Sequence, residues 1–132
     1  MFKSLDHLAI VVPDTEAALC LWRDQLGLPV LFTEVVNNAT VRLTHLDLGN
    51  THLQLVEPLT ADHPMRTWLE ANGPGLHHFC LAVEDVGEAA AALPAMGLAP
   101  TAPMPHQGTG GRRALFVDRA GTGNVLVELT GR

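Results

Sequence analysis

The sequence has little of several features that mark particular classes of protein. It carries 8 basic against 14 acidic residues, and its net charge of −6 argues against sequence-independent binding of nucleic acid, which needs a basic surface. Its two cysteines, Cys20 and Cys80, have neither a metal-binding spacing nor the pattern of a disulfide framework. The single lysine, Lys3, lies in the N-terminal tail, which disfavours Schiff-base chemistry.

Signals for membrane insertion or export are missing too. No apolar run approaches the roughly 20 residues that cross a bilayer, and residues 1–4 lead directly into a predicted strand instead of a signal peptide. Nearly half of the 132 residues are apolar, which is enough to bury a core. We therefore expect one globular domain in a reducing compartment, the cytoplasm, with no membrane partner.

What the sequence does have is an internal repeat. Two stretches share one layout, a buried strand with a histidine near its start that runs into an acidic helix cap; they are residues 5–14 and 76–85. His7 and His78 correspond in this alignment and are 71 positions apart. A second pair, Gln54 and Glu128, ends the two copies and is 74 positions apart. The chain therefore consists of one unit written twice, with a potential ligand at both ends of each copy.

Each copy is predicted to fold as strand, helix, strand, strand, strand. Asp14 and Asp85 are suited to cap the two helices, and Pro94 should kink the second helix near its end. The predicted strands are residues 5–12, 30–36, 40–48 and 51–57 in the first copy and residues 76–83, 98–104, 113–118 and 124–130 in the second. We expect a single domain made of a first module (about 1–58), a connector with a short helix (about 59–74) and a second module (about 75–132).

This duplicated unit, with its polar residues, resembles the vicinal oxygen chelate superfamily, which includes glyoxalases, bleomycin resistance proteins and dioxygenases. Within it, the sequence is most similar to the methylmalonyl-CoA epimerases. The similar segments are Leu48-Gly49-Asn50-Thr51, Val56-Glu57-Pro58, Gly75-Leu76-His77-His78, Gly108-Thr109-Gly110-Gly111-Arg112-Arg113 and Val125-Leu126-Val127-Glu128-Leu129. The resemblance implies an α+β fold in which two tandem βαβββ modules form a curved, eight-stranded mixed sheet around a metal-binding cup. It also implies four metal ligands: His7, Gln54, His78 and Glu128.

The residue types support the same four ligands. Side chains alternate between the two faces of a strand, so a ligand must share its face with the cavity, and His52, Gln54 and Val56 share one face. Two imidazoles with one carboxylate and one amide oxygen suit Co²⁺, Mn²⁺, Ni²⁺ or Zn²⁺. Four protein ligands on an octahedral ion leave two neighbouring positions open, where two oxygens of a substrate can bind.

Each ligand has a simpler interpretation on its own. His7 alone would be a hydrogen-bonded core histidine, Gln54 a satisfied interior amide, and Glu128 the partner of an arginine. Their coincidence at repeat-related positions favours the metal site. His77 faces away from His78 and is assigned to structure or to support of the site. Three further histidines are expected on the surface or in loops: His45, His63 and His106.

The resemblance implies proton transfer at a carbon α to a thioester, with the metal binding the thioester carbonyl and the neighbouring carboxylate. The epimerases carry an acidic residue in the turn between the second and third strands, where this chain has Asn37-Asn38. An amide cannot abstract a proton, and Glu34 is too far along the strand to replace the missing acid. The candidate bases are therefore Glu128, released from the metal, and His52, while Asn38 is assigned to substrate binding.

A glycine-rich loop supplies candidates for binding the rest of the substrate. Gly110, Arg112 and Arg113 can hold the phosphates of a CoA tail through backbone amides and guanidinium groups. A plain hairpin turn is an equally good interpretation of this loop. Because each copy alone offers a four-stranded sheet with exposed edges, we also expect a homodimer.

Three other functions remain open for this ligand set. A glyoxalase I-like lyase would share the metal and the fold, but its ligand set carries Glu where this chain has Gln54. An extradiol-type dioxygenase would bind Fe²⁺ through the facial triad His7, His78 and Glu128. A non-catalytic small-molecule binding or resistance protein would lack the metal ligands, whose presence counts against this reading.

Overall fold

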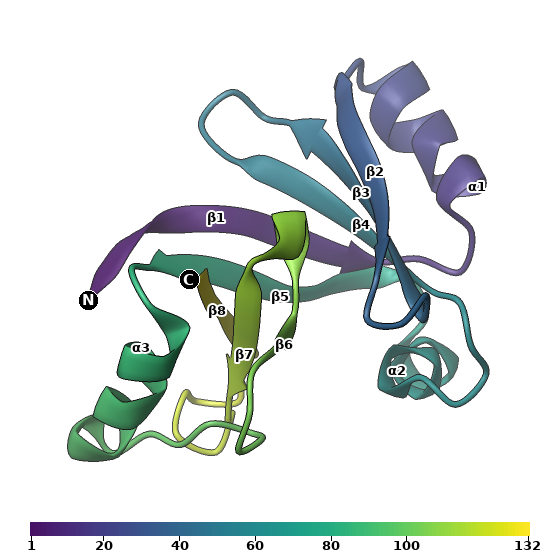
Figure 1. Cartoon of the computed structure of the whole chain (residues 1–132). Helices are drawn as coiled ribbons and strands as arrows, with labels where there is room; N and C mark the ends of the chain where they lie inside the picture. The colour runs from purple at the N-terminus through teal and green to yellow at the C-terminus, as the bar shows by residue number, and fades with distance from the viewer. The chain divides into compact units, whose positions relative to one another are not determined.

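A computed structural model describes residues 1–132 (Figure 1). The first copy contains β1 (Phe2–Val11), α1 (Thr15–Leu19), β2 (Val30–Val36), β3 (Val41–Asp47) and β4 (His52–Pro58). The connector contains α2 (Pro64–Asn72). The second copy contains β5 (Gly75–Val83), α3 (Val86–Ala92), β6 (His106–Gln107), β7 (Arg113–Val117) and β8 (Val127–Gly131). Each copy is thus strand, helix, strand, strand, strand, as predicted.

Backbone hydrogen bonds join the eight strands in the order β2-β3-β4-β1-β5-β8-β7-β6. β5 and β8 are parallel, whereas the pairs β2–β3, β3–β4, β6–β7 and β7–β8 are antiparallel. The predicted α+β fold, with two βαβββ copies and a mixed eight-stranded sheet, is confirmed. None of the helices is both long enough and apolar enough to cross a membrane.

The chain forms two compact units that do not coincide with the two copies. The central unit is Leu8–His77, and the terminal unit combines Met1–His7 with His78–Arg132. The unit boundaries fall inside β1 and β5, directly after His7 and directly before His78. Both of these histidines therefore belong to the terminal unit.

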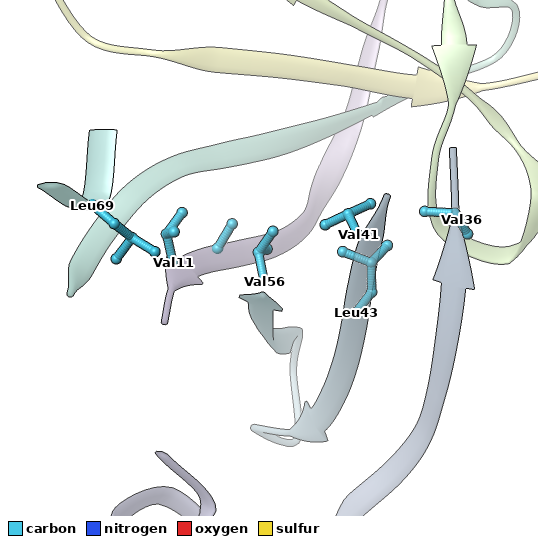
Figure 2. Packing of buried hydrophobic residues seen from close by; sticks show 7 residues of the cluster. Val11, Val36, Val41, Leu43, Val56 and Leu69 are labelled. Atoms are coloured by element: carbon cyan, nitrogen blue, oxygen red, sulfur yellow. The ribbon is translucent and has the colours of Figure 1, made fainter. Parts of the chain in front are cut away.

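The central unit has an apolar cluster on each side of its strands. One cluster includes Leu69 of α2, with Trp68 packed against it, and consists of Ala9, Val11, Val36, Val41, Leu43, Val56 and Leu69 (Figure 2). The other includes Leu19 of α1, with Trp22 packed against it, and consists of Ile10, Val12, Leu19, Leu46, Leu53 and Leu55. Successive residues of β1 enter different clusters because strand side chains alternate faces. This explains why β1 is apolar on both faces, as the sequence predicted.

The helix signals read from the sequence act as expected. The side chain of Asp14 accepts a hydrogen bond from the backbone N–H of Ala17, and Asp85 accepts one from that of Glu88. After α1 the chain continues as a π-helix, η1 (Cys20–Gln25). After α3 it tightens into a 3₁₀-helix, η2 (Leu93–Met96), which contains Pro94 and replaces the end of the α-helix. The predicted disruption of the helix by Pro94 is confirmed, as an end of the α-helix at Ala92.

The predicted strand at residues 98–104 is wrong. Only Pro100 makes a bridge there, to Val117, and the strand that pairs with β7 is the two-residue β6 further along the chain. Prolines at positions 100, 103 and 105 explain the difference. Each proline lacks the backbone N–H that a sheet ladder needs, so the segment cannot pair continuously. Apart from the isolated bridge at Pro100, pairing with β7 is therefore confined to His106 and Gln107, after the last of the three prolines.

Candidate metal centre

Three side chains of the terminal unit come together at a buried point. They are His7 on β1, His78 on β5 and Glu128 on β8, and one ligand atom from each lies within 4.8 Å of the others. Oε1 of Glu128 is 3.4 Å from Nε2 of both His7 and His78. The two imidazole rings approach edge to face, with centroids 5.8 Å apart. The structure thus assembles three of the four predicted ligands.

Strand register places these side chains on one face. β5 and β8 are parallel, with Cys80 opposite Glu128. His78 lies two residues before Cys80 and so points to the same face as Glu128. Cys80 is fully buried beneath this group, and burial raises the pKa of its thiol, so the thiol is uncharged and unreactive at neutral pH.

A carboxylate orients His7 from the side away from Glu128. Nδ1 of His7 is 2.8 Å from Oδ2 of Asp6, and Arg112 donates to both carboxylate oxygens of Asp6 at 3.0 and 3.2 Å. An Nδ1–H that donates to Asp6 leaves the lone pair of Nε2 directed toward Glu128. Carboxylates commonly fix metal-binding histidines in this way. Although burial alone would raise it, the pKa of Asp6 falls to about 2 because His7 and Arg112 stabilise its charged form.

The electrostatics of the group favour a charged carboxylate. Burial alone would raise the pKa of Glu128, but the imidazoles of His106, His7 and His78 outweigh burial and hold that pKa well below its usual value. Burial would lower the pKa of His7, but Asp6 and Glu128 outweigh it and raise the pKa.

The donor set fits a divalent metal ion. Two imidazole nitrogens and one carboxylate oxygen are borderline ligands suited to first-row metals such as Zn²⁺, Co²⁺ or Fe²⁺. The 3.4 Å separations are longer than the 2.7–2.9 Å of a charge-assisted hydrogen bond. They match donors that each lie about 2.1 Å from one ion, which would be roughly 3.0 to 3.4 Å apart. His7, His78 and Glu128 are therefore able to hold such an ion.

A third histidine contacts Glu128, and the sequence reading missed it. Nε2 of His106, on β6, lies 3.3 Å from Oε2 of Glu128. The His106 ring stacks on Phe116 with centroids 5.6 Å apart, and Phe116 also meets the edge of the His78 ring at 4.9 Å. A signal was present in the repeat: the 74-residue spacing that relates Gln54 to Glu128 also relates Phe32 to His106.

The fourth predicted ligand, Gln54, belongs to the central unit. It is buried on β4, directly opposite His45 of β3. His45 was expected on the surface, but it is fully buried, stacked on Phe32 and 3.7 Å from the carboxylate of Glu34. The structure corrects that expectation because β3 pairs on both sides, with β2 and with β4. His52, a predicted base, lies at the start of β4 with its ring 6.0 Å from that of His45.

Comparison with known proteins identifies the family. The family model of the glyoxalase/bleomycin resistance protein/dioxygenase superfamily matches residues 6–116. The chain belongs to this superfamily. The ethylmalonyl-CoA/methylmalonyl-CoA epimerase of Cereibacter sphaeroides is 34% identical over 131 residues, covering 98% of both chains. The mitochondrial methylmalonyl-CoA epimerase of mouse is 32% identical, over 95% of this chain and 71% of its own, and protein YqjC of Bacillus subtilis is 35% identical over 95% and 89%.

Solved structures of the superfamily lead to the same group of enzymes. A variant of Streptomyces coelicolor methylmalonyl-CoA epimerase in complex with 2-nitronate-propionyl-CoA superimposes with a TM-score of 0.89 at 32% identity, covering 99% of this chain and 95% of its own. The Mycobacterium tuberculosis methylmalonyl-CoA epimerase gives a TM-score of 0.90 at 26% identity, covering 98% and 88%. The fold predicted from the duplicated unit is the fold of these epimerases.

The residues predicted to bind substrate belong to both units, three to the terminal unit and Asn38 to the central unit. Gly110, with φ 65°, is in the 3₁₀ turn η3 (Thr109–Gly111), which links β6 to β7 as predicted for the glycine-rich loop. Arg112 is held by Asp6 but remains partly exposed, whereas Arg113 donates to Asp85 at the start of α3 and to the backbone of Arg132. Asn38 is in the β2–β3 turn of the central unit, with φ 56°.

The two remaining histidines have local roles. His77, predicted to serve the structure or to support the site, meets the Trp68 ring edge-on with centroids 5.0 Å apart. His63, expected in a loop, caps α2 by accepting a hydrogen bond from the backbone N–H of Met65. Neither contact involves a member of the metal-ligand group.

Proposed function

We propose that this superfamily member is a divalent-metal-dependent epimerase or isomerase that moves the α-proton of a thioester such as methylmalonyl-CoA. The observation that carries the proposal is the buried group of His7, His78 and Glu128, in a chain whose relatives of similar length include epimerases of acyl-CoA thioesters. His7, His78 and Glu128 would hold the ion, with Gln54 as the predicted fourth ligand. A divalent ion bound there would polarise the thioester carbonyl as a Lewis acid.

The chain's own residues divide the remaining tasks. Glu128 is the first candidate for the base, because it is the carboxylate of the buried group and could accept the proton once released from the ion. His52 is the second candidate. Asn38 can offer an amide hydrogen bond to the substrate but cannot abstract its proton. Gly110, Arg112 and Arg113 are proposed to hold the phosphates of the CoA tail through backbone N–H groups and guanidinium donors.

Solvent exchange tests the reaction directly. Cobalt-loaded protein in deuterated water should replace the α-proton of methylmalonyl-CoA by deuterium, followed by nuclear magnetic resonance of the substrate. Glu128→Gln should slow the exchange at least about 100-fold if Glu128 is the base, since general-base catalysis contributes about 10²–10⁴-fold. If Glu128→Gln keeps the full rate of α-proton exchange and His52→Ala loses it, His52 is the base. No exchange by the loaded wild-type protein would contradict the proposed reaction.

One observation favours a second candidate function. His7, His78 and Glu128 are the two histidines and one carboxylate of the facial triad found in Fe²⁺ oxygenases. A dioxygenase would consume oxygen when the iron-loaded protein is mixed with a catechol. Oxygen uptake without any α-proton exchange would replace the epimerase proposal with this one.

A further inference from the structure

The two carboxylate oxygens of Glu128 face different partners. Oε1 is directed to the two predicted metal ligands His7 and His78, at 3.4 Å from each. Oε2 is directed to Nε2 of His106, at 3.3 Å. The side chain of Glu128 is 10% exposed and that of His106 is 36% exposed, so the partner of Oε2 is more open to solvent than the carboxylate itself. The carboxylate thus has an inner oxygen and an outer oxygen.

The packing of His106 is built into the fold by the repeat. In the second copy His106 on β6 stacks on Phe116 of β7, and Phe116 is the register partner of Glu128 on β8. In the first copy the order of the rings is reversed. Phe32 on β2 stacks on His45 of β3, and His45 is the register partner of Gln54 on β4.

Each copy therefore places one aromatic pair beside one predicted ligand, but with the two rings exchanged. This reversed order of the two rings puts the histidine of the second copy on the edge strand β6. There its Nε2 reaches Oε2 of Glu128. A stacked ring fixes the plane of the imidazole, because the flat faces of the two rings pack together at an interplanar angle of 17°. Phe116 thus holds His106 in the orientation that its contact with Glu128 requires.

We propose that His106 is a positioning residue for Glu128. Its Nε2–H holds Oε2, so that only Oε1 is offered to a metal ion. The inference rests on the proposed function in taking Glu128 as a ligand and as the candidate base. A carboxylate that binds through one oxygen occupies one coordination position instead of two, which leaves more positions open for the two oxygens of a substrate. Partners that orient a ligand in this way typically contribute 10–100-fold to metal affinity or activity.

Two variants separate the donor from the ring. His106→Phe keeps a ring that can stack on Phe116 but has no N–H, and His106→Gln keeps an amide N–H near the place of Nε2 but has no ring. His106→Leu is a second variant without a donor, in case the phenylalanine does not fit. Met104→Gln serves as a control, because Met104 lies just before β6 and is 73% exposed. Thermal unfolding of each protein without metal checks that the variants are folded.

The measurement is cobalt binding by calorimetry, with α-proton exchange as an independent readout. We expect His106→Phe and His106→Leu to bind Co²⁺ about 10- to 100-fold more weakly, and His106→Gln to stay within about threefold of wild type, like the control. In the exchange assay, kcat should fall in the donor-less variants while KM changes less than about threefold, because the carboxylate and not the CoA tail is displaced. His106→Gln should restore most of this loss.

Any other pattern of cobalt binding overturns the inference. Full cobalt affinity in His106→Phe means that the ring contact alone is sufficient, and weak binding in His106→Gln means that the N–H is not what matters. If the wild-type protein binds no cobalt, both the inference and the proposed metal site are wrong. If the expected cobalt pattern is found but wild type exchanges no α-proton of methylmalonyl-CoA, the positioning role stands and only the proposed function fails.

Discussion

The two edge strands, β2 and β6, come from equivalent places in the repeat and differ in length and surface. β2 pairs with β3 from Val30 to Val36, whereas β6 pairs with β7 only at His106 and Gln107. β2 has no proline, and the segment before β6 has three. The long edge exposes four apolar side chains, and the short edge brings His106 to Glu128. The two equivalent edges thus differ in what they present: apolar side chains on β2, and a histidine in contact with Glu128 on β6.

The turns that follow these two strands also differ, in the residues that occupy their left-handed positions. The β2–β3 turn has three consecutive left-handed residues, Asn37, Asn38 and Ala39, with φ of 53°, 56° and 61°. The β6–β7 turn has glycine at its left-handed positions, Gly110 and Gly111. Asparagine tolerates this conformation better than other residues with a side chain. The first turn can therefore present a polar side chain where the second presents only backbone.

The largest effect is expected from adding a carboxylate to the first turn. Asn38→Glu supplies an acid where the related epimerases are predicted to carry one, and it should raise the rate of α-proton exchange by about 10²–10⁴-fold if the wild type lacks a strong base. The measurement is the deuterium exchange of methylmalonyl-CoA. Asn38→Gln is the matched control, because it has the same size and backbone strain without the charge. An equal gain in both variants would show that the carboxylate is not responsible.

The next prediction contrasts the ligands of the two units. His78→Ala removes a nitrogen donor from the assembled group, and we expect at least about 100-fold weaker cobalt binding with the protein still folded, because a methyl group cannot coordinate. Gln54→Ala removes the one predicted ligand of the central unit. An amide oxygen is a weaker ligand than an imidazole for these metals, so a loss of about 10-fold is expected. Unchanged metal content in both variants, measured by elemental analysis, would end the metal-centre proposal.

The group of His7, His78 and Glu128 could be predicted from sequence because strand alternation is a local signal and the internal repeat marks equivalent positions. A strand alternates its side chains with a period of two, and the repeat spacings of 71 and 74 residues pair His7 with His78 and Gln54 with Glu128. The same local cues predicted the capped helices and seven of the eight strands at about their observed places. The role of these residues as ligands remains a prediction that metal binding must test.

His45 and His106 could not be placed from sequence because their surroundings are set by distant pairings. His45 is buried only because β3 has neighbours on both sides, and His106 meets Glu128 only because β6, β7 and β8 are adjacent. The strand predicted at residues 98–104 also ended before His106, which placed this histidine in a loop. Apolar residues between the prolines suggested a strand, and the loss of three backbone donors prevented it.

The residues that precede the two ligand histidines offer a smaller test of the difference between copies. Asp6 contacts Nδ1 of His7 and is held by Arg112, whereas His77, its equivalent before His78, contacts Trp68. Asp6→Asn should weaken cobalt binding about 10- to 100-fold, since the amide orients His7 less strongly and does not raise its basicity. His77→Asn is the matched control and should change the affinity less than about threefold. Equal effects in calorimetry would contradict the orienting role of Asp6.

The long edge of β2 offers a contact for the expected homodimer, for which helix faces or sheet edges are the candidate surfaces. Val30, Leu31, Phe32 and Val35 are each 38 to 47% exposed on this strand. An exposed apolar edge strand favours pairing with a second chain. Val35→Lys should weaken dimerisation at least about tenfold, because burying a valine contributes about 1.5–3 kcal/mol and a lysine resists burial. Val125→Lys, at a position 48% exposed outside β2, is the control. Light scattering that finds only a 14.1 kDa species at micromolar concentration would contradict the dimer.

The smallest effect concerns the contribution of Asp6 to acid stability. The pKa of Asp6 is about 2 in the folded protein against an ordinary value of 3.8, because hydrogen bonds from His7 and Arg112 outweigh burial. A depressed pKa means that Asp6 adds stability above about pH 4 and that this contribution disappears as the pH falls toward 2. The free energy of unfolding, measured with urea at pH 6, 4, 3 and 2, should therefore differ between wild type and Asp6→Asn by an amount that shrinks over the last three pH values. His77→Asn should show a difference that stays constant over that range, because this substitution leaves the carboxyl group of Asp6 in place. A difference between wild type and Asp6→Asn that is the same at pH 6 and pH 2 would mean that the charge of Asp6 does not stabilise the fold.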